Sequence, residues 1–140
     1  MLKLLKIVLL VVFSISLLCG FSFHKKNKEK PYVIFSASKI NKDVLQDCKT
    51  LFEKGEVINY LVYVPEGFKD DFVRIQILKK DTKVDFAGYS VKYTQDREVV
   101  KNSKQFSGQI TFYESGTYVI QVIDFSNPYE AAAAGAFKIE

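Results

Sequence analysis

The stretch that decides the fold is FVRIQILK, residues 72–79. Val73, Ile75 and Ile77 form an apolar series, and the residues between the members of that series are polar. Successive side chains of an extended strand point to opposite faces, so this alternation predicts a strand with one buried face.

Six more stretches have the same extended character and are separated by turn residues. They are residues 32–38, 57–64, 88–93, 109–113, 117–123 and 136–139. A helical turn fits best at residues 41–48, where Asn41 can serve as the N-cap. The alanines at 131–134 are expected to lead into the last strand and to let another backbone come close. Seven or eight short strands without long helices predict an all-β fold, an antiparallel β-sandwich.

The chain begins with a hydrophobic signal segment. Lys3 and Lys6 precede an apolar run at residues 7–18, which is shorter than the roughly 20 apolar residues that a membrane-spanning helix needs. We therefore divide the chain into a leader (1–19), a polar tether (20–30) and a β-sandwich domain (31–140), and expect export from the cytoplasm.

The end of the leader, LLCG at residues 17–20, resembles the lipobox of bacterial lipoproteins. The resemblance implies cleavage before Cys19, lipidation of Cys19, and anchoring to the cell envelope membrane on the periplasmic side or at the cell surface. Leu18 departs from the small residue usual at that position. Cleavage near Gly20 and an uncleaved anchor are the alternatives.

The positive charge of the chain belongs to its leader and tether. The net charge is +4, but six of the 20 basic residues and only one of the 16 acidic residues precede Pro31. The domain from Pro31 onward therefore carries a net charge of −1. Nucleic-acid binding normally requires a basic face, so no nucleic-acid partner is expected.

The residues that commonly support catalysis or metal binding are scarce. The one histidine, His24, lies in the tether, and Cys48 is the only cysteine of the domain. Cys–His catalysis and a multi-histidine zinc site are thereby excluded within the domain. We expect no cofactor and no metal, and we expect Cys48 to be partly buried and inert.

The segment ESGTY, residues 114–118, resembles the approach to strand F of immunoglobulin-like domains. The resemblance implies that Tyr118 forms a tyrosine corner, in which the hydroxyl bonds back to nearby backbone. Ile120 stands where antibody domains place a cysteine, so the resemblance is to members without a disulfide. The segment FEKGE, residues 52–56, is similar to the early strands of bacterial immunoglobulin-like domains.

Five residues are predicted as possible contacts with a partner. Phe125, Asn127 and Tyr129 lie in the loop that joins the last two predicted strands, although an Asn-Pro turn also explains that sequence. Tyr89 and Tyr93 are expected to share one strand face with Val91, either as a platform for a glycan or a protein or as core residues.

The sequence thus predicts a non-enzymatic protein, tethered to the envelope membrane, that presents a β-sandwich surface to another protein. Its partners would be membrane lipid through Cys19 and an envelope protein or glycan. The first alternative is a carbohydrate- or small-ligand-binding module that uses exposed aromatics. The second is a small hydrolase built on a pair of carboxylates, with no catalytic residues identified.

Overall fold

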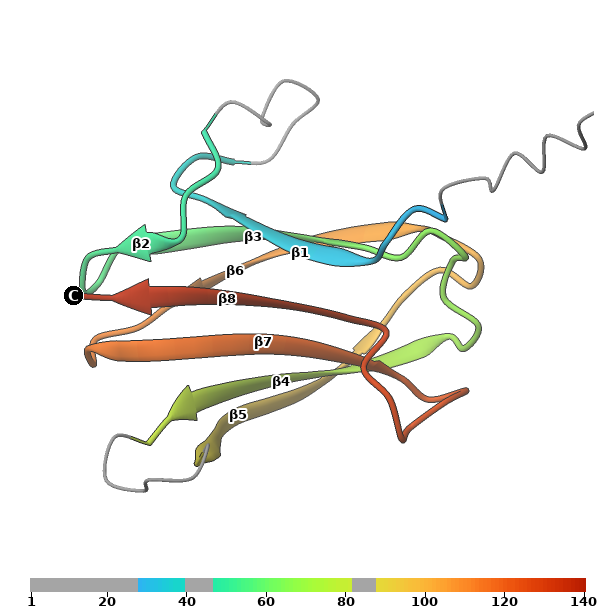
Figure 1. Ribbon diagram of the computed structural model, residues 1–140. Helices are drawn as coiled ribbons and strands as arrows, with labels where there is room; N and C mark the ends of the chain where they lie inside the picture. The colour runs from blue at the N-terminus through green and yellow to red at the C-terminus, as the bar shows by residue number, and fades with distance from the viewer. Residues whose placement is uncertain (1–27, 40–46, 82–87) are drawn as a thin grey trace, which may run out of the picture.

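The computed structural model describes residues 28–39, 47–81 and 88–140, which form eight β-strands in two facing sheets (Figure 1). The smaller sheet has the order β1-β3-β6, with the strands at Tyr32–Ser36, Val57–Tyr63 and Gln105–Thr111. The larger sheet has the order β2-β8-β7-β4-β5, with the strands at Leu51–Phe52, Ala133–Ile139, Gly116–Asp124, Phe72–Lys80 and Tyr89–Glu98. The predicted all-β sandwich is confirmed.

The pairing of the strands is antiparallel with one exception. The two-residue strand β2 runs parallel to β8, with Leu51 opposite Lys138 and Phe52 opposite Ile139. The sequence analysis did not predict strand β2 or its parallel pairing. The parallel pair needs no crossover helix, because β2 and β8 are joined through the rest of the sandwich.

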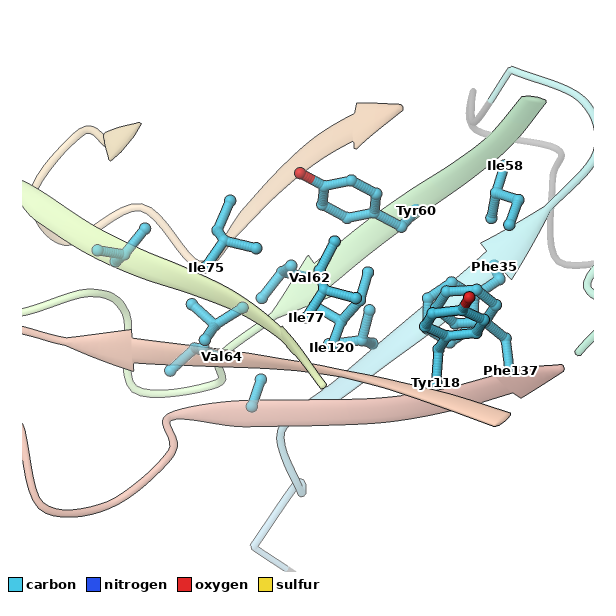
Figure 2. Close-up of a cluster of buried hydrophobic side chains, with 14 of the residues drawn as sticks. Phe35, Ile58, Tyr60, Val62, Val64, Ile75, Ile77, Tyr118, Ile120 and Phe137 are labelled. Atoms are coloured by element: carbon cyan, nitrogen blue, oxygen red, sulfur yellow. The ribbon is translucent and has the colours of Figure 1, made fainter. Parts of the chain in front are cut away.

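The core lies between the sheets and follows the predicted alternation (Figure 2). In β4 the buried side chains are Val73, Ile75 and Ile77. In β7 the buried side chains at alternate positions are Tyr118, Ile120, Val122 and Asp124. The period of two therefore assigns both strands correctly, since each presents every second side chain to the opposite sheet.

Tyr118 forms the predicted tyrosine corner. Its hydroxyl donates a hydrogen bond to the backbone oxygen of Glu114 at 2.8 Å. The ring itself is buried against Phe137, with the centroids 5.4 Å apart. With two facing sheets and this corner, the domain is an immunoglobulin-like β-sandwich.

Three strands start or end three or more residues away from their predicted bounds. Strand β5 continues five residues past Tyr93, β6 begins at Gln105 instead of Gln109, and β8 begins at Ala133. Within β6, a glycine is required at Gly108, because a Cβ atom would collide with the ring and hydroxyl of Tyr60. The expected close approach of another backbone occurs at Gly135, where a Cβ would lie 2.6 Å from the Val33 oxygen.

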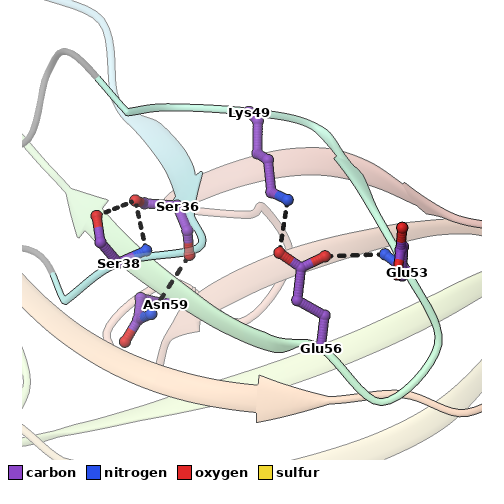
Figure 3. A network of polar contacts seen from close by, with 6 residues as sticks. All are labelled: Ser36, Ser38, Lys49, Glu53, Glu56 and Asn59. Carbon is purple, nitrogen blue, oxygen red and sulfur yellow. Dashed lines mark hydrogen bonds and ion pairs between the residues drawn. The ribbon is translucent and has the colours of Figure 1, made fainter.

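A polar network fixes the start of β3 (Figure 3). Glu56 accepts hydrogen bonds from Lys49 Nζ at 2.5 Å and from the Glu53 backbone N–H at 2.9 Å. The bond from Lys49 lowers the pKa of Glu56. The turn is completed by Gly55, whose φ of +78° suits glycine. The residues of FEKGE thus build the turn that leads into β3.

Several sequence predictions fall outside the described residues. These are the leader at 1–19 with Cys19, the tether as far as residue 27, and residues 41–46 of the predicted helical turn. Within the described ranges, no helix is long and apolar enough to cross a membrane.

Candidate functional site

The two sheets have unequal widths, which leaves one side of the sandwich open. Three strands face five, and β5 and β6 are edge strands of their respective sheets. Nine of the ten β5 residues are exposed and the other is half-buried. A strand that is covered on one face buries every second side chain, so the exposure of β5 shows that the opposite sheet does not cover it. The open side between β5 and β6 is the candidate functional site.

A β-bulge at Lys92 places Tyr89 and Tyr93 on opposite faces of the sheet. Tyr93 pairs with the buried Ile77, but Val91 pairs with Leu78, the next residue of β4. Paired residues point to the same face, so Tyr93 faces inward while Val91 and Tyr89 face outward. The prediction that both tyrosines share a face with Val91 is therefore wrong. The two rings do not form one aromatic platform.

The inward face of β5 borders a cleft of about 380 Å³ on the open side. We call it the β5–β6 cleft. Its lining residues come from β3, β4, β5 and the end of β6: Tyr60, Ile75, Ile77, Lys92, Tyr93, Gln95, Gln109, Ile110, Thr111 and Phe112. Such a volume, with apolar walls and a few polar groups, is within the range of ligand sites.

Arg97 lies outside the lining of this cleft but interacts with Tyr60, one of the lining residues. Its guanidinium donates a hydrogen bond to the Ser107 backbone oxygen at 2.7 Å and lies 4.7 Å from the centre of the Phe106 ring. The Arg97 side chain thus links β5 of the larger sheet to β6 of the smaller sheet, two edge strands that share no backbone pairing. Burial raises the pKa of the neighbouring Tyr60, an effect that the Arg97 charge opposes. Tyr60 therefore stays a neutral phenol at physiological pH.

The predicted contact residues of the β7–β8 loop lie at one end of the sandwich. Tyr129 is almost wholly exposed, at 97%. Phe125 lies beneath Arg74, 5.4 Å from the guanidinium carbon, and Arg74 in turn forms an ion pair with Asp96 at 2.7 Å. The Asn127 N–H bonds to the Asp124 backbone oxygen at 2.9 Å. The three residues share a loop but do not converge on one pocket: of the three, only Asn127 lines the neighbouring cavity.

That neighbouring cavity, of about 600 Å³, lies between the β3–β4 and β7–β8 loops and the N-terminal segment at residues 28–31. Four carboxylates line it: Glu29, Glu66, Asp124 and Glu130. The Lys28 side chain lowers the pKa of Glu66, with which it forms an ion pair at 2.5 Å. A glycosidase acid needs a raised pKa, so Glu66 does not suit that role.

Asp124 organises the loops around this cavity. Its carboxylate accepts hydrogen bonds from the backbone N–H groups of Lys69 at 2.7 Å and Ser126 at 2.9 Å. Burial raises the pKa of this carboxyl, but the hydrogen bonds to its ionised form outweigh burial, and the pKa lies below its ordinary value of 3.8. The role of Asp124 is thus structural.

Replacing Asp124 with asparagine is expected to lower the free energy of unfolding by about 1–3 kcal/mol at neutral pH. The side-chain NH₂ group of asparagine would replace one carboxylate oxygen and would face a backbone N–H, so that this donor would lose its acceptor. The folded pKa is depressed, so the stabilisation by the ionised group is present above 3.8 and is lost as the pH falls through the folded pKa. Urea unfolding at neutral and acid pH should show a flatter acid dependence for Asp124→Asn. An unchanged dependence would contradict this assignment.

Cys48 differs from its expectation. It is exposed, not partly buried, and its backbone forms an isolated antiparallel bridge with Ser36 of the edge strand β1. Cys19 lies outside the described residues, so its lipidation stays a prediction.

Sequence reasoning missed most residues of the cleft. Gln95 lies beyond the predicted end of β5, and Gln109 and Thr111 were predicted as strand residues but not as site residues. The signal that could have found them is the unbroken polar stretch after Tyr93, which suits an uncovered edge strand.

No protein-family model matches the chain, and no curated protein matches it. Solved structures with a similar fold include an uncharacterised protein from Bacillus anthracis, 24% identical, with a TM-score of 0.42 over 64% of this chain and 75% of that one. An immunoglobulin-like protein from Pseudomonas aeruginosa is 12% identical, with a TM-score of 0.49 over 80% and 93% of the two chains. The PmoD soluble domain from a Methylocystis species is 14% identical, with a TM-score of 0.48 over 79% and 90%.

Proposed function

We propose that this chain is a non-enzymatic envelope protein, tethered to the membrane through Cys19, whose immunoglobulin-like sandwich binds another protein. The fold hosts many functions, so the proposal rests on the surface and not on the fold. The observation that carries it is the apolar character of the exposed β4–β5 hairpin.

An apolar row crosses the outer face of the larger sheet. Leu78 lies between Val91 on β5 and Val119 on β7, and Val119 pairs with Ala136 on β8. Val91 is 54% exposed, and Tyr89, two residues before it on the same face, extends the exposed apolar surface along β5. Contiguous apolar surface of this kind marks contact sites for proteins, since it is costly to leave in water.

The attachment of the N-terminal segment supports a contact on this face. Lys28 forms an ion pair with Glu66, and the Tyr63 hydroxyl donates to the Glu29 carboxylate, so the tether joins the sandwich at the end that carries the β7–β8 loop (Figure 1). A lipid at Cys19 would therefore direct Phe125 and Tyr129 toward the membrane. The apolar row would face sideways, where a neighbouring protein can reach it.

Chemical crosslinking of intact cells that produce the full chain tests the proposal. The parent chain is expected to form a discrete adduct with another protein, and Val91→Glu is expected to reduce that adduct by about tenfold, because a buried unpaired charge is costly at an interface. Tyr129→Glu, on the exposed loop, is the matched control and should leave the adduct unchanged. The intact mass of the extracted protein should begin at Cys19 and include acyl chains.

Equal adduct yields for Val91→Glu and Tyr129→Glu would remove the apolar row as the contact surface. A mass that begins after Gly20 without acyl chains would remove the lipid tether.

A further inference from the structure

The outward edge of β6 offers backbone hydrogen-bonding groups that no neighbouring strand of the described residues uses. Val64 N–H bonds to the Lys104 oxygen at 2.7 Å, and the register pairs Val62 with Phe106, so the even-numbered residues of β6 bond to β3. The groups of Gln105, Ser107, Gln109 and Thr111 then point away from β3. Consistently, the Ser107 oxygen accepts the hydrogen bond from Arg97 across the open side. No strand within the described residues pairs with this edge.

A strand added beside Gln109 and Thr111 would cover the β5–β6 cleft. The cleft lies between these residues and the inward face of β5, where the Tyr93 hydroxyl and the Gln95 side chain are hydrogen-bonded at 3.1 Å. Its floor is made of Ile75 and Ile77 of β4. An apolar side chain of the added strand would fill this space and bury surface that the narrower sheet leaves exposed.

The charge at the cleft selects an acidic segment. Lys92 is the only charged residue among those that line it. Lys92 helps to lower the pKa of the Glu114 carboxylate. That carboxylate, however, is already ion-paired with Lys79 Nζ at 2.5 Å. The nearby cation Arg97, outside the lining, bonds to a backbone oxygen and stacks on Phe106. A carboxylate beside Lys92 would therefore meet a cation that lacks a dedicated partner in the cleft.

The edge of β5 is less suited to strand addition than the edge of β6. The bulge at Lys92 interrupts its ladder, and Arg97 points inward, and both features are devices that protect edge strands. Strand β6 has no such interruption along its register with β3.

We propose that β6 accepts an extended acidic segment of a partner protein as a fourth strand of the smaller sheet. An apolar side chain of the segment enters the β5–β6 cleft, and a carboxylate of the segment lies beside Lys92. This mode uses main-chain hydrogen bonds for affinity and the cleft for specificity. The proposal rests on the proposed function as a protein-binding module and names the chemistry of the partner.

The test measures binding of three acetylated nine-residue peptides to the full chain in detergent, by calorimetry. In each peptide valine and threonine alternate. One carries two glutamates, one carries two lysines, and the third is the glutamate peptide with alternate amides N-methylated. The glutamate peptide should bind saturably, and the lysine peptide should bind about tenfold more weakly because of its repulsion by Lys92. The methylated peptide should not bind.

Two variants separate strand addition from mere adhesion. Thr111→Pro removes one outward N–H without touching the bonds to β3 and should weaken binding by about tenfold, whereas Thr111→Val, which keeps the N–H, should stay within about twofold. Lys92→Glu should reverse the preference in favour of the lysine peptide, a gain that misfolding cannot imitate.

Absence of saturable binding by the glutamate peptide, equal binding by Thr111→Pro and Thr111→Val, or an unchanged preference in Lys92→Glu would each overturn the proposal. If the crosslinked adduct that depends on Val91 persists in Thr111→Pro while the peptides fail to bind, protein binding stands and strand addition alone is lost.

Discussion

Replacing Phe137 with alanine is expected to lower the free energy of unfolding by about 3–5 kcal/mol, the usual cost of removing a buried aromatic ring. Phe137 is 2% exposed. Four rings surround it, with centroid distances of 5.0 Å to Phe35, 5.4 Å to Tyr118, 5.8 Å to Phe112 and 6.3 Å to Phe52. Figure 2 shows the first two of them beside Phe137. These rings are contributed by both sheets, with Phe35 from the smaller sheet and Tyr118 from the larger. No single neighbouring ring can therefore move to fill the cavity that the loss of the Phe137 ring would leave.

Urea unfolding of the full chain in detergent measures this loss. Tyr129→Ala is the matched control, since it also deletes an aromatic ring but one that is 97% exposed, and it should change the unfolding free energy by no more than about 0.5 kcal/mol. Similar values for the two variants would show that Phe137 does not hold the sheets together.

Replacing Gly135 with alanine is expected to cost about 1–3 kcal/mol, because the core has no room for the added methyl group. A Cβ at this position would lie 2.6 Å from the Val33 backbone oxygen and 2.9 Å from the Val33 Cβ. Backbone entropy acts in the other direction, since a compatible glycine-to-alanine change stabilises by about 0.4–1 kcal/mol. The steric effect should dominate, because the nearest neighbour is main chain and cannot rotate away.

Thermal unfolding decides the sign. Gly135→Ala should melt at a lower temperature than the parent chain, while Ala134→Ser, which changes the adjacent exposed position, should melt at nearly the same temperature. A raised melting temperature for Gly135→Ala would mean that β1 and β8 can separate at little cost.

Alternation in the sequence predicted the strands that lie between two neighbours. Ile75 in β4 and Ile120 in β7 are paired on both sides, so burial imposes a strict period of two. The same reasoning failed at Tyr93, because the sequence does not reveal that a bulge at Lys92 shifts the alternation of faces by one residue. It also missed the first half of β6, where Gly108 admits the Tyr60 ring.

The candidate site was less predictable than the fold. Phe125, Asn127 and Tyr129 were found because a loop with aromatics can be recognised locally. The β5–β6 cleft is formed by side chains such as Tyr60 and Tyr93, which lie on different sheets. Their meeting depends on one sheet being two strands narrower than the other, and strand order is a long-range property that local patterns do not contain.

The extra residue at Lys92 makes the register of the β4–β5 hairpin matter as much as its composition. A ladder without the bulge, in which Lys92 paired with Leu78, would rotate Tyr89 and Val91 into the interior and turn Ser90 outward, without altering any side chain. Shifts of register, more than substitutions, are therefore the changes through which descendants of this chain would exchange one recognition surface for another.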